Sequence, residues 1–290
     1  HPRVRRSRRL GDLADEQIEG WRSVAAGWER RRGLFWEATR PVSERMVELL
    51  DPREGETVLD LAAGPGDTGF LAARRLGTDG LLLSTDAAPE MVEAARRRGA
   101  ELGLVNVEYR IVDAAAIDLP DASVDGVLCR YGVMLVPDCE AAALEVARVL
   151  RPGSRAAIAV WAEPDRNDWM TAAGRAALAH GMIDRPAPDA PGPFRLADPQ
   201  RLSRLLEGAG LEVTSVEDVE ITWRAWSFDE WWDVTLDTSR MLARAVATAT
   251  SAQIEAIRTG AAERLARYVA ADGSVAVPGL ARVALAELPG

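Results

Sequence analysis

The stretch VLDLAAGPGDTG, residues 58–69, joins a short apolar run to a glycine-rich turn. Its last six residues have the spacing G-x-G-x-x-G, which lets a backbone approach a bound phosphate group closely. This spacing alone occurs in proteins of many kinds, so it does not identify the ligand. The residues around the turn must show whether it would hold a dinucleotide or another molecule.

Apolar runs and helical segments alternate on either side of this turn. Near-continuous apolar runs are typical of parallel strands that helices cover on both faces. The alternation therefore predicts an α/β fold with a Rossmann-like, doubly wound sheet. The apolar runs are residues 57–61, 80–86, 107–113, 124–130 and 155–161, and the helical segments are 70–76, 89–102 and 139–150.

The segments that flank this core are mostly helical. Like charges repel in the arginine-rich residues 1–12, which are predicted to form a disordered arm. Residues 13–50 are predicted to form a helical N-terminal lid, and residues 51–162 the cofactor-binding core. The rest is divided into a cap segment, a helix with a sixth strand, a helical lid insertion and a last strand, at 163–197, 198–226, 227–278 and 279–290.

The composition excludes several classes of protein. The 290-residue chain has a net charge of −10, which would repel the phosphate backbone of a nucleic acid. Two cysteines and two histidines are too few for a disulfide framework or a histidine-rich metal centre. No apolar run approaches the roughly 18 residues of a membrane span. We expect a cytoplasmic protein with no metal, no membrane partner and no nucleic-acid partner.

Acidic residues stand where the predicted strands end, and ligands of an open α/β sheet bind at that edge. Asp60 and Asp67 would oppose a phosphate and favour a cationic ligand such as S-adenosylmethionine, which carries an ammonium and a sulfonium. Asp86 suits the two hydroxyls of a ribose, and Asp113 beside Ala114 suits an adenine amine.

Each of these carboxylates has a simpler interpretation. Asp67 is also a suitable helix N-cap, Asp60 could bond local backbone, and Asp113 could cap a helix or turn. A nicotinamide dinucleotide would use Asp86 in the same way, so an NAD-dependent oxidoreductase stays an alternative.

Four segments, in their order and spacing, resemble the class I S-adenosylmethionine-dependent methyltransferases. The similarity is strongest to the ubiquinone/menaquinone-biosynthesis-like branch, methyltransferase type 11, and covers roughly residues 40–162. It implies a sheet of seven strands, with the last inserted antiparallel between the fifth and the sixth. Ala62 stands where the family pattern has its first glycine. The segments are VLDLAAGPG, STDAAPEMVEAA, VDAAAIDLPDASVDGVLCR and EVARVLRPG.

The resemblance also implies the cofactor contacts. Asp60 and the backbone of residues 62–66 would hold the methionine part, Asp86 the ribose, and the turn at residues 129–131 would close over the methionine end. The other implied contacts surround the adenine. Together the predicted cofactor-binding residues are Asp60, Ala62, Gly64, Gly66, Asp86, Ala87, Met91, Asp113, Ala114 and Arg130.

The aromatic residues point to the acceptor of the methyl group. All nine tryptophans lie outside residues 37–160, in the regions that usually form a lid in this family. They favour a planar or lipophilic acceptor, although many would also pack the lid against the core. The predicted substrate pocket is formed by Trp28, Trp36, Tyr131, Met134, Trp161 and Trp169.

Methyl transfer from a sulfonium needs alignment and exclusion of water but no obligatory base. His180 and Tyr131 are the candidate catalytic residues, against a helix C-terminal position for His180 and simple packing for Tyr131. The sequence thus predicts a methyltransferase that acts by in-line displacement on a small, aromatic or lipophilic acceptor. The alternative is a non-catalytic sensor or partner protein that binds S-adenosylmethionine or S-adenosylhomocysteine. Whether the chain forms a homodimer is left open.

Overall fold

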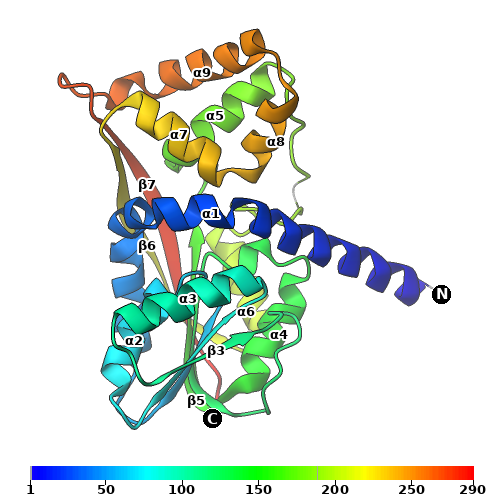
Figure 1. Ribbon diagram of the computed structural model, residues 1–290. Coiled ribbons are helices and arrows are strands. Elements are labelled where there is room, and N and C mark those ends of the chain that lie inside the picture. The colour runs from blue at the N-terminus through cyan, green and yellow to red at the C-terminus, as the bar shows by residue number, and fades with distance from the viewer. Residues whose placement is uncertain (1, 188) are drawn as a thin grey trace.

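The computed structural model describes the backbone of residues 2–187 and 189–290, and side chains from residue 26 onward within these ranges. His1, which belongs to the predicted arm, lies outside the described residues. Figure 1 shows a sheet flanked by helices, a group of cap helices beyond one end of the sheet, and a long N-terminal helix between the two.

In the described part of the chain, seven strands form one sheet in the order β3-β2-β1-β4-β5-β7-β6. Strand β7 is antiparallel to β5 and to β6, while the other pairs are parallel. The predicted fold class and the antiparallel insertion of the last strand are both confirmed. The strands are β1 (Thr57–Leu61), β2 (Leu81–Asp86), β3 (Val107–Ile111), β4 (Val124–Arg130), β5 (Leu150–Trp161), β6 (Glu212–Ala225) and β7 (Val275–Glu287).

The register of the central strands brings their carboxyl ends to one edge. Leu59 of β1 pairs with Leu83 of β2 and Val127 of β4, and all three side chains are buried. Burial on both faces explains why these strands are apolar along their length rather than alternating. The residues that end β1, β2 and β4 therefore lie close together.

Helices cover both faces of this sheet. Two of them begin with an aspartate cap, because the side chain of Asp138 accepts a hydrogen bond from Ala141 and that of Asp198 accepts one from Gln200. The covering helices are α2 (Asp67–Leu76), α3 (Pro89–Glu101), α4 (Cys139–Val149) and α6 (Pro199–Gly208).

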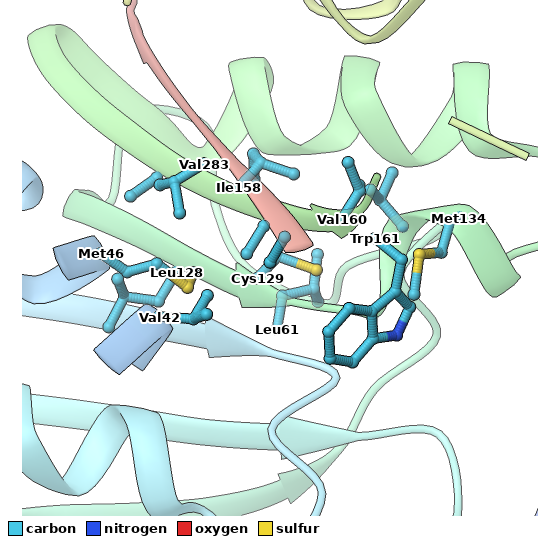
Figure 2. Close-up of a cluster of buried hydrophobic side chains, with 14 of the residues drawn as sticks. Val42, Met46, Leu61, Leu128, Cys129, Met134, Ile158, Val160, Trp161 and Val283 are labelled. Atoms are coloured by element: carbon cyan, nitrogen blue, oxygen red, sulfur yellow. The ribbon is translucent and has the colours of Figure 1, made fainter. Parts of the chain in front are cut away.

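The N-terminal helix α1 (Pro2–Leu50) is continuous where the sequence predicts an arm followed by a lid. The helix thus begins well before residue 13, and the predicted division of this region stays a prediction. Pro41 lies inside the helix, and the ribbon changes direction before its C-terminal end (Figure 1). Figure 2 shows Val42 and Met46 of α1 beside Leu128 of β4, so this end is part of the core.

The cap helices are carried by a long hairpin. Strands β6 and β7 pair along their whole length, but β5 pairs with β7 only from Ala281 onward, so the far half of the hairpin extends past β5. The last strand predicted at residues 279–290 begins earlier in the structure, because β7 starts at Val275. The cap consists of α5 (Asp168–Ala179), α7 (Phe228–Thr238), α8 (Arg240–Thr248) and α9 (Ser251–Leu265).

The helical lid insertion predicted over residues 227–278 contains three separate α-helices, α7, α8 and α9. Ser239 and Thr250 each cap a new helix with the side-chain oxygen, and Thr250 forms a capping box with Gln253. Among the described residues, no helix combines the length and the apolar character that crossing a membrane requires.

Candidate active site

The glycine-rich turn after β1 is built from left-handed backbone. Ala62, Gly64 and Gly66 have φ angles of 55°, 56° and 88°. A Cβ atom at Gly66 would lie 2.4 Å from the ring of Phe70, so only glycine fits between the turn and α2, whereas a Cβ atom at Gly64 would point into open space. Ala62 adopts this conformation at a cost of about 1 kcal/mol, which a single alanine tolerates.

Asp60 is buried below this turn. Its Oδ2 accepts a hydrogen bond from the backbone N of Gly69 at 2.9 Å, while Oδ1 is buried without a partner among the described residues. Burial raises the pKa of this carboxyl to about 7. The simpler interpretation, a bond to local backbone, thus accounts for one oxygen and leaves the other for a ligand.

Asp86 ends β2 on the other side of the turn. Its Oδ2 accepts a hydrogen bond from Gly64 N at 3.0 Å, and its Oδ1 accepts one from Ala88 N at 2.9 Å. Each oxygen keeps a second lone pair, which suits the hydroxyls of a ribose. Ala87, half-buried, and Met91, buried at the first turn of α3, follow this carboxylate.

The two remaining carboxylates have partners within the chain. Asp113 is exposed, and its side chain accepts a hydrogen bond from Ala115 N at 2.9 Å, so it forms the turn that the sequence left as an alternative. Ala114 beside it is buried. Asp67 is not the N-cap of α2, since Gly66 occupies that position, and it pairs instead with Arg32 of α1 at 3.0 Å.

The guanidinium of Arg130, the last residue of β4, has few partners within the described part of the chain. One nitrogen donates a hydrogen bond to Thr39 Oγ1 of α1 at 2.6 Å, and the guanidinium lies 5.3 Å from the ring centre of Tyr131. It forms no ion pair with any described residue. The positive charge is close enough to lower the pKa of Asp60, although burial of Asp60 outweighs it.

Six aromatic residues form a continuous set of ring contacts, which we call the aromatic row. Tyr131 stacks on Trp161 at 3.9 Å between ring centres, and Trp161 contacts Trp169 edge-on at 5.2 Å. The contacts continue to Trp223, to Phe35 of α1 and then to Trp28. The row is thus Tyr131, Trp161, Trp169, Trp223, Phe35 and Trp28.

Most of the predicted pocket residues meet at this row. Trp28, Tyr131, Trp161 and Trp169 are members of it, and Figure 2 shows Met134 beside Trp161. Trp36 is half-buried and makes no ring contact with the described members.

His180 lies at the C-terminal end of α5 and is exposed. Trp169 is eleven residues earlier on this helix, so about 16 Å separates the two positions along its axis. The structure does not bring His180 to the aromatic row. Within the described residues, no group of histidine, cysteine and carboxylate side chains is arranged to hold a metal ion.

A groove of about 700 Å³ opens between α1 and α3 beside the glycine-rich turn. Pro65 of the turn, Trp28 and Arg32 of α1, and Met91 of α3 are among its lining residues. One wall of the groove therefore comes from α1 and the other mainly from α3, which carries the predicted cofactor residue Met91.

Sequence reasoning missed several residues that build this region. Phe35 and Trp223 complete the aromatic row, Arg32 pairs with Asp67, and Thr39 binds Arg130. Phe35 and Trp223 belong to the aromatic-rich flanks, so that enrichment was a usable signal. Nothing local distinguishes Arg32 or Thr39 from neighbouring surface residues, because their partners lie far away in the sequence.

The sheet order and the acidic carboxyl edge define a class, the Rossmann-like fold of class I S-adenosylmethionine-dependent methyltransferases. A putative methyltransferase from Bacillus halodurans has a similar fold, with a TM-score of 0.58, 18% identity, and coverage of 86% of this chain and 99% of that one. Residues 52–185 match the family model described as a methyltransferase domain.

Two relatives are similar to part of this chain. Nocamycin O-methyltransferase of Saccharothrix syringae is 40% identical over 116 residues, which are 40% of this chain and 41% of that protein. The ubiquinone/menaquinone biosynthesis C-methyltransferase of Enterobacter is 31% identical over 153 residues, 52% of this chain and 61% of that one. The matched segments thus span less than two thirds of these relatives.

Proposed function

We propose that this protein transfers a methyl group from S-adenosylmethionine to a small acceptor with an aromatic or lipophilic body. The observation that carries the proposal is the position of the aromatic row. It starts at Tyr131, directly after β4, and the turn there touches the glycine-rich turn: a Cβ atom at Gly132 would lie 2.5 Å from that of Ala62. An apolar surface therefore adjoins the predicted methionine end of the cofactor site.

The residues at the sheet edge fit S-adenosylmethionine. The unpartnered Oδ1 of Asp60 suits a cationic group, because an unpaired buried oxygen is costly and a positive charge would compensate it. Gly64 leaves open space above the turn, and the carboxylate of Asp86 has lone pairs for a ribose. A dinucleotide phosphate would instead face the buried carboxylate of Asp60.

The chain contributes binding, orientation and exclusion of water. When bound, the cofactor supplies an activated methyl group: the acceptor forms the new bond to its carbon while the electron pair of the sulfur–carbon bond returns to sulfur. The aromatic row would orient the acceptor in a dry environment. We assign no general base to His180 or Tyr131, and a proton displaced from the acceptor would leave to solvent when the site opens.

Two further observations support a small acceptor. The relatives that match this chain are named for nocamycin and for ubiquinone and menaquinone, which are small molecules. The net charge of −10 disfavours a nucleic-acid substrate. We further propose a cytoplasmic location, and homodimer formation stays open.

Calorimetric titration with S-adenosylhomocysteine tests the cofactor site. We expect binding by the wild type and at least a tenfold loss in Asp86→Ala, because removal of one charge-assisted pair of hydrogen bonds costs about 1.5–3 kcal/mol. Asp79→Ala is the matched control, since Asp79 is exposed in the loop before β2, at the opposite edge of the sheet. No binding by the wild type would reject the proposal.

Competition and turnover separate the other functions. Displacement of S-adenosylhomocysteine by NADH would favour an oxidoreductase. Tight binding without methyl transfer to any member of a broad panel of phenols, quinones and amines would favour a sensor or partner protein.

A further inference from the structure

Tyr131 is the bulkiest residue with a positive φ angle in the described part of the chain. Its φ is 60°, and the other non-glycine residues of this kind are Asp51, Ala62 and Ala122. A large side chain is rarely placed in this conformation, which costs of order 1–3 kcal/mol and is concentrated at functional sites. In this conformation the Tyr131 ring stacks on Trp161.

The hydroxyl of Tyr131 is buried and has no hydrogen-bond partner among the described residues. Native proteins leave few buried polar atoms unpaired, because an unpaired hydroxyl costs about 1–3 kcal/mol. Strain and an unpaired hydroxyl thus coincide in one residue. This residue adjoins the turn that would hold the reactive end of the cofactor.

The surroundings favour an oxygen as the missing partner. The guanidinium of Arg130 lies 5.3 Å from the centre of the Tyr131 ring and has only one hydrogen bond, to Thr39. Its positive charge would repel an ammonium group and attract an electron-rich atom. The ring of Trp161 stacks on Tyr131, and Trp169 lies beyond it, so the adjoining surface is aromatic and suits a flat apolar body.

We propose that Tyr131 determines acceptor specificity: its hydroxyl donates a hydrogen bond to a carbonyl or phenolic oxygen of a planar acceptor that packs against the aromatic row. This inference rests on the proposed function. It makes phenols, and planar aromatic molecules that carry a carbonyl oxygen in addition to a nucleophilic atom, the acceptor class, and it disfavours aliphatic amines.

The hydroxyl acts as a donor and not as a base. Burial raises the pKa of Tyr131 well above its usual value, and this outweighs the opposite effect of Arg130. The group therefore keeps its proton at neutral pH. A protonated hydroxyl can hold an acceptor oxygen in place but cannot remove a proton from the acceptor.

Because the hydroxyl of Tyr131 is buried, the acceptor reaches it only when the surrounding chain opens, and α1 contacts this region at two points. Phe35 of α1 packs on the row at Trp223, and Thr39 bonds Arg130. The ion pair of Arg32 with Asp67 holds the same segment on the core.

Matched probe pairs test the proposal. The affinities of 1-indanone and indane, and of 9-fluorenone and fluorene, are measured by tryptophan fluorescence quenching with the protein saturated with S-adenosylhomocysteine. Within each pair only the ketone carries an oxygen. We expect the wild type to bind the ketone about threefold to tenfold more tightly, as one hydrogen bond predicts, and Tyr131→Phe to lose this preference.

Tyr109→Phe is the control, because the Tyr109 hydroxyl is also buried without a partner but lies on β3, outside the aromatic row. It should keep the ketone preference. Thermal melting of both variants reports folding. Equal affinities for ketone and hydrocarbon in the wild type, or a preference that survives in Tyr131→Phe, would overturn the proposal. So would a failure of both pairs to bind. Absence of S-adenosylhomocysteine binding would instead reject the proposed function itself.

Discussion

Asp60 shows how a single carboxylate can mark a ligand site. Its side chain is buried between β1 and α2. Only glycine fits at position 69 of α2, since a Cβ atom at that position would lie 2.5 Å from Asp60 Oδ2. One oxygen is bonded to Gly69 N and the other is unpaired. A group arranged in this way is poorly stabilised as an anion until a cation arrives.

The raised pKa of Asp60, about 7, predicts a pH dependence of cofactor binding. Binding of the cationic methionine part requires the ionised carboxyl, whose fraction rises about tenfold between pH 6 and pH 8. Calorimetry with S-adenosylhomocysteine over this range should show an affinity gain of similar size.

The control is Asp60→Asn, in which this gain should shrink. A smaller dependence of the same sign should remain, because burial also raises the pKa of Asp86.

The stability of the protein without cofactor should change with pH in the opposite direction. A folded-state pKa above the unfolded value near 4 means that stability from protonated Asp60 is lost as pH rises from about 4 through 7. An equal pH profile of cofactor affinity for the wild type and Asp60→Asn would contradict the role of Asp60 in cofactor binding.

At the scale of elements, α1 connects the cofactor turn to the cap. Arg32 pairs with Asp67, and Ser43 Oγ lies 2.9 Å from Thr68 Oγ1, so α1 is held on the start of α2. The two residues that precede Arg32, Arg30 and Arg31, pair with Asp237 of α7. The helix α1 is therefore bonded to α2 of the core and to α7 of the cap.

Arg32→Ala should release the core side of this helix and speed cofactor exchange. A partly exposed ion pair is worth roughly 0.5–1 kcal/mol, so the dissociation rate of S-adenosylhomocysteine, measured by stopped flow, should rise about twofold to fivefold. Salt should reduce the difference between wild type and variant.

Arg40→Ala is the matched control, because Arg40 pairs with Glu44 within the same helix and contacts neither the turn nor the cap. Equal dissociation rates for the two variants would show that the Arg32 pair does not limit exchange.

At the scale of the whole molecule, Asn167 joins the cap to the sheet. Its Oδ1 accepts hydrogen bonds from Trp169 Nε1 and Leu280 N, and its Nδ2 donates to the carbonyls of Ala162, Glu163 and Leu280. The side chain is fully buried. One amide thus fixes the end of β5, the start of α5 and the middle of β7 relative to one another, and it orients a ring of the aromatic row.

Asn167→Ala should lower the free energy of unfolding by about 2–4 kcal/mol, because several buried polar groups would lose their partners together. Chemical denaturation measures this change. Asp165→Ala, at an exposed neighbouring position, should leave the stability nearly unchanged. An Asn167→Ala protein as stable as the wild type would show that other contacts hold the cap.

Much of the fold and part of the site follow from local sequence. The strands and helices of the core are recognisable because apolar runs and helical periodicity are properties of short segments. Asp60 and Asp86 lie at the sheet edge that the strand pattern predicts, since residues near the end of a parallel strand reach that edge whatever the distant chain does. The breaks at Ser239 and Thr250 were also encoded locally, in cap residues that the helical periodicity obscured.

Other features depend on contacts between distant residues. The sequence by itself determined the class of the domain, the glycine-rich turn and the carboxylates at the ends of the first three strands. Only the tertiary structure decided that Asp67 pairs with Arg32, that Trp36 stays outside the aromatic row while Phe35 joins it, and that the Tyr131 hydroxyl has no partner. The reason is physical: a turn or strand end is specified by neighbouring residues, whereas burial and pairing depend on which distant surfaces the fold brings together.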